Sequence, residues 1–203
     1  MAERVDRIET ERLVLRPLRC EDLEPLVALG ADRDVMRYIG SGKPQSRREA
    51  SQWFERLMEE TIDGPAGPAG LPGWRAVTTR VGGDWIGLAA LKCLAQQHAA
   101  AVGIESSVEV GYRLAPRFWG QGYATELSRA LARHAFEQVG LPQLVAIADA
   151  RNLASSRVLE KTGLKHRKTY AIDGRTIRFF ALSADEYHQA RNDEMAQRAR
   201  RLS

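Results

Sequence analysis

RFWGQGYATEL, residues 117–127, places two glycines one residue apart at the start of a predicted helix. Gly120 and Gly122 follow Pro116 closely, and the helix-forming run begins at Tyr123. Glycine weakens both helices and strands, so two of them at an element junction indicate an unusual demand on the backbone. The segment is therefore either an ordinary turn or a loop whose bare backbone holds a phosphate.

A loop that enters a helix N-terminus offers unpaired backbone N–H groups and the positive end of the helix dipole. The glycines at 120 and 122 lack the Cβ atoms that would hold a phosphate away, and they allow a positive φ. Arg117 adds a formal positive charge beside them. Hydrogen bonds from N–H groups to charged oxygens contribute about 1.5–3 kcal/mol each, which suits a pyrophosphate.

Three phosphate-binding patterns compete for this loop. The Walker pattern requires a lysine and then a serine or threonine after its last glycine, and neither glycine here is followed by that pair. The dinucleotide fingerprint requires a third glycine where this chain has Thr125. Asp149 ends the next predicted strand, as a ribose-binding acid would, but too few residues follow it for the remaining strand–helix units. The third pattern is Arg117-x-x-Gly120-x-Gly122 between a strand and a helix.

Hydrophobic periodicity on both sides of the loop predicts alternating strands and helices. Strands are predicted at 12–18, 74–81, 85–94, 107–116, 143–149, 164–172 and 175–183. Helices are predicted at 20–32, 46–62, 123–140, 152–163 and from residue 185 onward, with a capping box between Ser46 and Glu49. The glycine- and proline-rich segment 63–73 and the alanine-rich segment 95–106 are predicted to be loops. We expect one α/β domain over residues 1–203, with a mostly antiparallel sheet and helices on both faces.

The composition excludes several classes of protein. The chain has 203 residues, of which 44% are hydrophobic and 28% charged, and its net charge is +4. These values indicate a globular protein, and no apolar run reaches the length of a membrane span. Cys20, Cys93 and four scattered histidines show no metal-ligand spacing, so no metal site is expected. The charged N-terminus predicts a cytoplasmic location, and nucleic acid is not an expected partner because no arginine-rich block is present.

The order and spacing of these motifs resemble the GNAT superfamily of N-acetyltransferases, in the branch that contains the RimJ and RimL ribosomal-protein N-terminal acetyltransferases. The resemblance rests on VEVGYRL (108–114), RFWGQGYATE (117–126), NLASSRVLEKTGL (152–164) and ETERLVLRPLRCEDLEPL (9–26), which together span most of the chain. It implies an α/β (α+β) fold with a mixed, mostly antiparallel twisted sheet, helices on both faces and a splayed central strand pair.

The resemblance also implies that acetyl-CoA is the cosubstrate. In the family the acyl-pantetheine arm lies between the splayed strands, which correspond to 112–115 and 144–148 here. The implied CoA-binding residues are Leu114, Arg117, Gly120, Gln121, Gly122, Tyr123, Ala124, Thr125, Asn152 and Ser155. The alternative for Asn152 is an ordinary helix N-cap, and this role is compatible with CoA binding. We expect Trp119 to anchor the loop by packing rather than to contact the ligand.

The implied reaction is direct acetyl transfer to a neutral amine, assisted by a carboxylate that removes its proton. Glu109, three residues before Tyr112, matches the position of the usual family base. The alternative is that Glu109 is an ordinary solvent-facing carboxylate on a strand.

The general acid departs from the family pattern. Many members carry a tyrosine seven residues after the asparagine to protonate the leaving thiolate, and this chain has Leu159 there. Ser155 or Ser156 can assist instead, or the thiolate can leave unprotonated, because a thiol pKa is only about 8.5. If a different group is the acid, Tyr112 is the first residue to test.

The acceptor is not encoded in a readable motif. By resemblance it is first a protein N-terminal α-amine, with a ribosomal protein as a possible partner. The alternatives are an antibiotic, a polyamine or another small amine, or a lysine side chain. Two rivals from other classes are an acyl-CoA-binding sensor without catalysis and an RNA- or ribosome-associated module. A monomer and a homodimer are both open.

Overall fold

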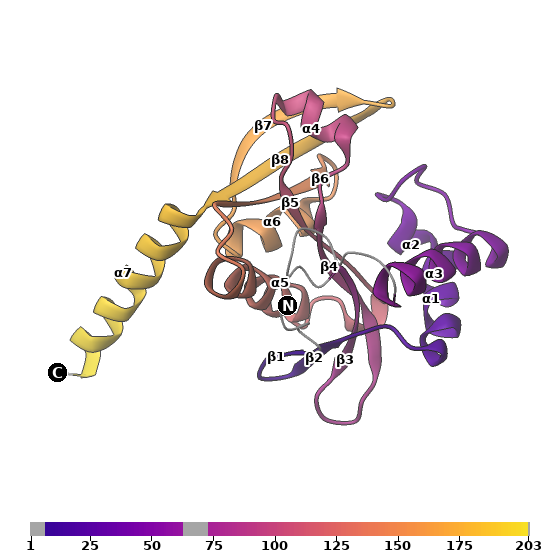
Figure 1. Cartoon of the computed structure of the whole chain (residues 1–203), viewed down its shortest axis with the longest axis horizontal. Coiled ribbons are helices and arrows are strands. Elements are labelled where there is room, and N and C mark those ends of the chain that lie inside the picture. Colours follow the sequence, from indigo (N-terminus) through magenta and orange to yellow (C-terminus); the bar gives the residue numbers. More distant parts are fainter. Residues whose placement is uncertain (1–6, 63–72, 203) are drawn as a thin grey trace.

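The computed structural model describes residues 7–62 and 73–202. Within them, eight strands form one sheet in the order β1-β2-β3-β4-β5-β6-β8-β7 (Figure 1). The strands are β1 (Ile8–Glu9), β2 (Leu13–Arg16), β3 (Gly73–Thr79), β4 (Trp85–Cys93), β5 (Val108–Leu114), β6 (Gln143–Asp149), β7 (Lys165–Ile172) and β8 (Arg175–Ser183). Neighbouring strands are antiparallel except β5 and β6, which are parallel. This confirms the expected mixed, mostly antiparallel sheet.

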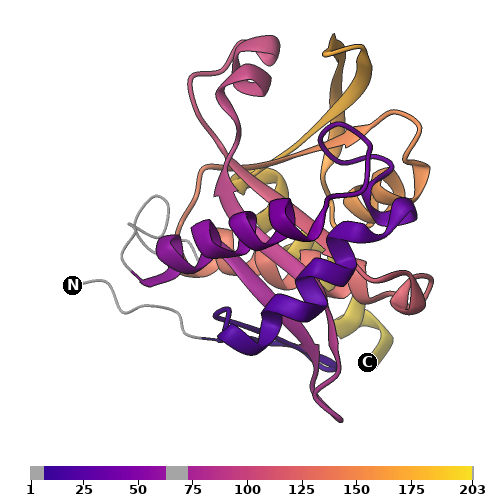
Figure 2. The same cartoon turned by 90° about the vertical axis from the view of Figure 1, so that its right-hand side faces the viewer.

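Helices cover both faces of the sheet. They are α1 (Leu23–Ala31), α2 (Arg33–Met36), α3 (Arg47–Ile62), α4 (Gln96–Val102), α5 (Tyr123–Arg133), α6 (Leu153–Lys161) and α7 (Ala184–Leu202). In Figure 2 the indigo and purple helices α1 to α3 lie across the front of the sheet. Helices α5 and α6 lie behind it, on the other side.

We call the two sides of the sheet the α5 face and the α3 face. On the α5 face, Leu127, Leu131 and Leu159 pack against strand residues that include Val110 and Leu144. On the α3 face, one core joins α1 and α3 to β3 and β4, and a second core joins α4 to β6 and β8. Because strand side chains alternate, the even-numbered residues of β5 belong to the α5 face and the odd-numbered ones to the α3 face.

Strands β5 and β6 pair only where they begin. Their register joins Val108 to Leu144 and Glu109 to Val145, and it ends there. Beyond this point β5 continues to Leu114 alongside β4, while β6 continues alongside β8. The two central strands therefore diverge, as the splayed pair in the predicted fold requires.

Local sequence signals account for several helix ends. The predicted capping box is confirmed, because Ser46 N–H donates to Glu49 Oε2 at 2.7 Å and Glu49 N–H to Ser46 Oγ at 3.3 Å. Gly103 ends α4 with φ +78°. None of the helices in the described part of the chain combines the length and apolarity that crossing a membrane requires.

The structure differs from the predicted elements in places where tertiary packing decides. The predicted loop at 95–106 is wrong in part, because residues 96–102 form α4. That helix lacks an apolar stripe, and Ala99 alone is buried, against the core that contains Val145. The predicted helix 123–140 is α-helical only to Arg133 and continues as a π-helical turn to Gln138. The short elements β1 and α2 were not expected. The expected loop at 63–73 lies, except for Gly73, outside the described residues.

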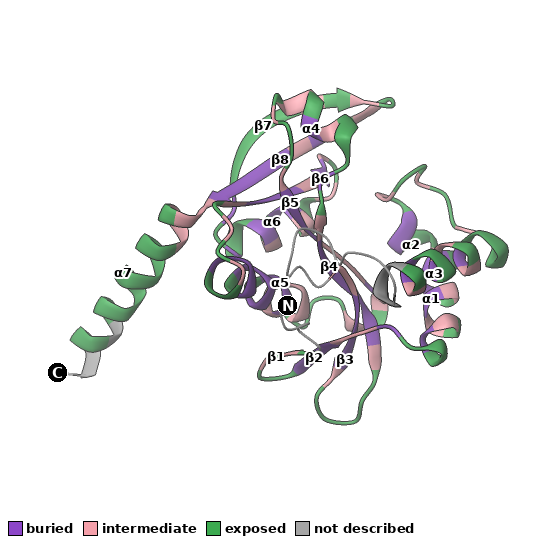
Figure 3. Cartoon of the chain, in the orientation of Figure 1, coloured by how far each residue is buried: buried purple, intermediate pink, exposed green. Residues whose placement is uncertain are grey.

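The outer strands of the sheet are short or charged. Strand β1 has two residues, and β7, at the opposite edge, is exposed along most of its length (Figure 3). Lys165 and Arg167 of β7 both bind Glu186 of α7, and Lys168 donates to the carbonyl oxygen of Ala101 at 2.9 Å. Helix α7 extends away from the sheet from the end of β8, the strand beside this edge (Figure 1).

Candidate active site

The glycine loop, residues 117–122, leads from β5 into the N-terminus of α5. Gly120 and Gly122 have φ values of +74° and +81°, in the left-handed region that favours glycine. Gly122 is the N-cap of α5, and the first intrahelical bond runs from Glu126 N–H to its carbonyl oxygen at 3.1 Å. No oxygen of the described residues accepts a hydrogen bond from the backbone N–H groups of 120–125. Six successive donors at a helix N-terminus form the kind of backbone surface that binds a phosphate.

Arg12 of β2 approaches the same loop, and sequence reasoning missed it. Its guanidinium donates to the carbonyl oxygen of Gln121 at 3.0 Å and lies 4.6 Å from the ring centre of Tyr123. Glu126 fixes this arginine, accepting from its Nε at 2.7 Å and from Thr10 Oγ1 at 2.6 Å. Burial disfavours ionisation of Glu126, yet these hydrogen bonds lower its pKa. No local motif in the sequence indicates this contact, because Arg12 lies over a hundred residues before the loop.

The remaining predicted loop residues have identifiable structural roles. Trp119 donates from Nε1 to the carbonyl oxygen of Leu114 at 2.7 Å, which ties the loop to the end of β5, while its ring stays 47% exposed. Gln121 Nε2 donates to the carbonyl oxygen of Arg117 at 2.9 Å. The Arg117 guanidinium is stacked 4.7 Å from the ring centre of Phe118. Tyr123, Ala124 and Thr125 form the first turn of α5, and Leu114 is buried.

These residues fit the pyrophosphate of CoA. A Cβ atom built at Gly120 would meet no atom within 4 Å, and one at Gly122 would meet only Arg12 Nη2, at 3.4 Å. The space beside the loop is thus open to a ligand, and the nearest group is a cation. Unpaired N–H donors, a helix dipole and two arginines make a consistent set for a multiply charged anion.

Tyr112, Ser155 and Asn152 meet on the α5 face, where β5 and β6 diverge. Asn152 caps α6 by accepting from Ser155 N–H at 3.1 Å, so its reading as a helix cap is confirmed. Ser155 Oγ lies 3.2 Å from Tyr112 Oη. Burial raises the pKa of Tyr112 to about 12, and the contact with Ser155 opposes this. The phenol therefore stays protonated through the neutral and mildly alkaline range.

The Ser156 hydroxyl and the Leu159 side chain, which takes the place of the family's tyrosine, both lie in the protein interior. Ser156 Oγ is buried and has no hydrogen-bond partner among the described residues. Leu159 is 1% exposed within the core of the α5 face. The position where many family members carry the acid is thus a packing position here, whereas Tyr112 and Ser155 form a hydroxyl pair on the part of β5 that β6 has left.

Glu109 lies on the α3 face and is only 7% exposed, so it is not an ordinary solvent-facing carboxylate. Its Oε2 accepts from Lys92 Nζ on β4 at 2.5 Å. His98 Nδ1 of α4 and Tyr170 Oη of β7 form a second pair on this face, 2.7 Å apart. Burial lowers the pKa of His98, while burial and the Glu109 charge raise the pKa of Tyr170 to about 12. Sequence reasoning did not find Lys92, His98 or Tyr170 as neighbours of Glu109.

Glu109 and Tyr112 therefore point to opposite sides of the sheet. Their separation of three residues, together with the regular register between β4 and β5, gives this result directly. The predicted base and the candidate acid are brought to the same strand but not to the same surface. For both to act on one ligand, that ligand must lie where β6 is no longer paired with β5.

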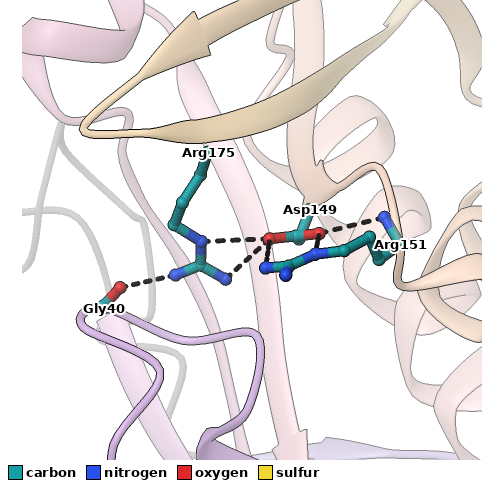
Figure 4. Close-up of polar contacts among 4 residues, drawn as sticks. All are labelled: Gly40, Asp149, Arg151 and Arg175. Atoms are coloured by element: carbon teal, nitrogen blue, oxygen red, sulfur yellow. Dashed lines mark hydrogen bonds and ion pairs between the residues drawn. The ribbon is translucent and has the colours of Figure 1, made fainter.

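Asp149, at the end of β6, is held by two arginines (Figure 4). It accepts from Arg151 Nε and N–H at 2.9 Å each, and from Arg175 Nε and Nη2 at 3.0 and 2.9 Å. Arg175 Nη1 also donates to the carbonyl oxygen of Gly40 at 2.5 Å. The hydrogen bonds from Arg151, with those from Arg175, hold the pKa of Asp149 well below its usual range. The network joins the diverged end of β6 to the β7–β8 hairpin and to the loop after α2, and it leaves no carboxylate oxygen unpaired for a ribose.

Comparisons with known proteins agree with this geometry. A model of the acetyltransferase (GNAT) domain matches residues 12–165. The chain is 31% identical over 163 residues to the FsC-acetyl coenzyme A-N(2)-transacetylase of Aspergillus fumigatus, a match that covers 80% of this chain and 66% of that protein, just under two thirds of it. Its fold is similar to that of a GNAT-family acetyltransferase from Bacillus anthracis, with a TM-score of 0.72 and 21% identity over 88% of this chain and 99% of that one. It is also similar to RimL, the ribosomal L7/L12 alpha-N-protein acetyltransferase solved with coenzyme A, with a TM-score of 0.67 and 15% identity over 89% of this chain and 99% of that one. At these identities the two structures bear on the fold alone.

Proposed function

Because the chain belongs to the GNAT acetyltransferase family, we propose that it transfers the acetyl group of acetyl-CoA to the α-amine of a protein N-terminus. The observation that carries the proposal is the row of six unpaired N–H groups at 120–125, next to the point where β5 and β6 diverge. When bound, acetyl-CoA supplies an activated thioester. The glycine loop, Arg12 and Arg117 would hold its pyrophosphate.

In our proposal the sheet separates the two substrates. The donor lies on the α5 face, where the backbone of Tyr112–Ala115 and of Ala146–Ala148 borders the divergence. The acceptor amine approaches from the α3 face, where Glu109 removes its proton, directly or through water. Tyr112 Oη, supported by Ser155, donates a proton toward the departing sulfur on the α5 face. In this proposal the amine is deprotonated on the α3 face, and the thiolate is protonated on the α5 face.

Two acceptor classes remain, and different relatives favour them. The resemblance of the sequence motifs at 108–126 and 152–164 to the RimJ and RimL branch favours a protein N-terminal α-amine, which we place first. The likeness to the FsC transacetylase, whose name specifies an N(2) acceptor, supports a small-molecule amine as the second candidate. A CoA-binding sensor without turnover is the non-catalytic alternative.

We also propose that residues 1–203 act as one domain. The family model ends at residue 165, but β8 pairs with β6 from Gln143 to Asp149, the whole of β6, and so continues the same sheet. A cytoplasmic location, expected from the sequence, stays a prediction.

The test is a thiol-release assay with matched acceptors. One peptide has a free N-terminus, a second has a blocked N-terminus and a free lysine side chain, and a third set contains small amines such as polyamines. Acetylation of the first peptide, located by mass spectrometry at the α-amine, supports the proposal. Turnover confined to the small amines would replace it with the second candidate, and CoA binding without any turnover would favour the sensor.

A further inference from the structure

Arg113 of β5 lies beside a pair of tryptophans on the α3 face. Its guanidinium carbon is 4.3 Å from the ring centre of Trp53 on α3 and 5.5 Å from that of Trp74 on β3. The two rings contact each other edge-on, with centres 5.6 Å apart. The rings contribute cation–π attraction to the guanidinium but offer no oxygen to accept from its N–H groups.

Among the described residues, no carboxylate or carbonyl oxygen accepts a hydrogen bond from the Arg113 guanidinium. This contrasts with two other arginines of low exposure. Arg16, whose side chain is 14% exposed, binds Asp22, and Arg175, at 17%, binds Asp149. Burial lowers the pKa of Arg113 to about 10, which reflects a desolvated cation with no compensating anion. A charge in that state gains most from a carboxylate brought by a ligand.

The position of Arg113 relates it to the proposed base. Glu109 and Arg113 lie on the same face of β5, four residues apart, so their Cα atoms are separated by roughly 13 Å at the usual strand rise. Between them is Gly111, where a Cβ would come within 4 Å of both Lys92 Cε and the Trp74 ring. The Lys92 side chain and the Trp74 ring therefore border the surface between the two charged residues. An extended peptide covers such a distance in about three to four residues.

We propose that Arg113 binds a carboxylate of the acceptor, and that preferred acceptors are peptide N-termini with an acidic side chain at the third or fourth position. This inference rests on the proposed function, because it assumes that the amine is deprotonated near Glu109. The tryptophans orient the guanidinium, and the incoming carboxylate accepts from its free N–H groups.

The experiment uses peptides that carry a single glutamate at each of the second to sixth positions, each paired with the same peptide carrying glutamine. For the wild-type protein, glutamate should raise kcat/KM over glutamine by about tenfold at the third or fourth position, mainly through KM. In Arg113→Gln this ratio should fall to about one. In Arg113→Lys, which keeps the charge but not the planar donors, part of the ratio should remain.

Arg56→Gln is the matched control, because it removes an exposed arginine from α3, one turn after Trp53. It should keep the wild-type ratio, which excludes a general effect of net charge. Thermal unfolding of each variant shows whether the fold is retained. Equal rates for glutamate and glutamine peptides at every position would overturn the inference, and so would a preference that survives in Arg113→Gln.

A binding measurement separates this inference from the proposed function. Calorimetry with the N-acetylated peptides, the expected products, needs no turnover. If the glutamate product binds the wild type about tenfold more tightly than the glutamine product, and Arg113→Gln removes the difference, the anion site is supported even if no peptide is acetylated. If peptides are acetylated but neither rate nor affinity responds to the carboxylate, the proposed function stands and this inference fails.

Discussion

Replacing Tyr112 with phenylalanine removes one hydroxyl and leaves the ring in the core of the α5 face. The lost contact is the 3.2 Å pair with Ser155 Oγ, so the free energy of unfolding should fall by only about 1 kcal/mol. The effect on turnover should be larger. Acid catalysis contributes typically 10²–10⁴-fold, and we expect the lower end, about 100-fold, because a thiolate is already a tolerable leaving group.

The pH profile follows from the raised pKa of Tyr112. An acid must be protonated to act, and burial holds this phenol in its protonated form up to about pH 12. Turnover should therefore rise with pH through the apparent pKa of the amine or its base, with no falling limb near pH 9–10. Because a serine hydroxyl would give the same profile, the profile alone does not separate Tyr112 from Ser155. The variants do.

The assay is thiol release at saturating acetyl-CoA, with CoA affinity measured separately by calorimetry. Ser155→Ala should reduce turnover by about tenfold, since it removes one hydrogen bond and leaves the phenol in place. A Tyr112→Phe protein whose turnover stays within about threefold of the wild type would show that the thiolate leaves without this acid. A wild-type falling limb near pH 10 would contradict the environment described for Tyr112.

Three further outcomes are expected. Glu109→Gln should lower turnover by about 100-fold with little change in acetyl-CoA binding, and equal turnover near neutral pH would remove Glu109 from the mechanism. Gly122→Val should weaken CoA binding at least about tenfold in calorimetry, because φ +81° strains a β-branched residue and the valine side chain displaces Arg12. Unchanged CoA affinity in the folded variant would refute this expectation. Asp149→Asn should cost about 3 kcal/mol in urea unfolding at neutral pH by leaving Arg175 without its carboxylate. The pKa of Asp149 is lower in the folded than in the unfolded protein. The stability that the ionised carboxylate contributes is therefore fully present above the unfolded pKa of about 3.9 and is lost as the pH falls through the folded pKa. If the stability difference between wild type and Asp149→Asn persisted unchanged in acid, that would count against the ion pair.

The parts of the site that are local in sequence were predictable. Gly120 and Gly122 indicate a backbone with positive φ before a helix, and Asn152 is a residue type preferred at helix N-caps. The opposite orientation of Glu109 and Tyr112 was also available from the sequence, because an odd separation along a strand changes the face. The sequence motifs alone, however, gave no reason to compare the side-chain directions of Glu109 and Tyr112.

The remaining parts depend on register and packing between distant segments. Lys92 meets Glu109 only because β4 and β5 pair in one particular register. Arg12 reaches the glycine loop because Glu126 anchors it from α5. Helix α4 was missed because its alanines give propensity without an apolar stripe, and its position comes from the core beneath it. Such contacts are long-range, and no local motif encodes them.

The two margins of the sheet have a consequence for how copies of this chain can associate. A strand margin with free N–H and C=O groups is a template for a neighbouring chain. Here β1 offers two residues, too few for a lasting ladder, and β7 presents three cations. Lys165 and Arg167 share the carboxylate of Glu186, and Lys168 donates to the carbonyl oxygen of Ala101. A second copy approaching margin to margin would bring like charges together. Self-association by continuing the sheet is therefore disfavoured, most strongly at low ionic strength, where charge repulsion is least screened.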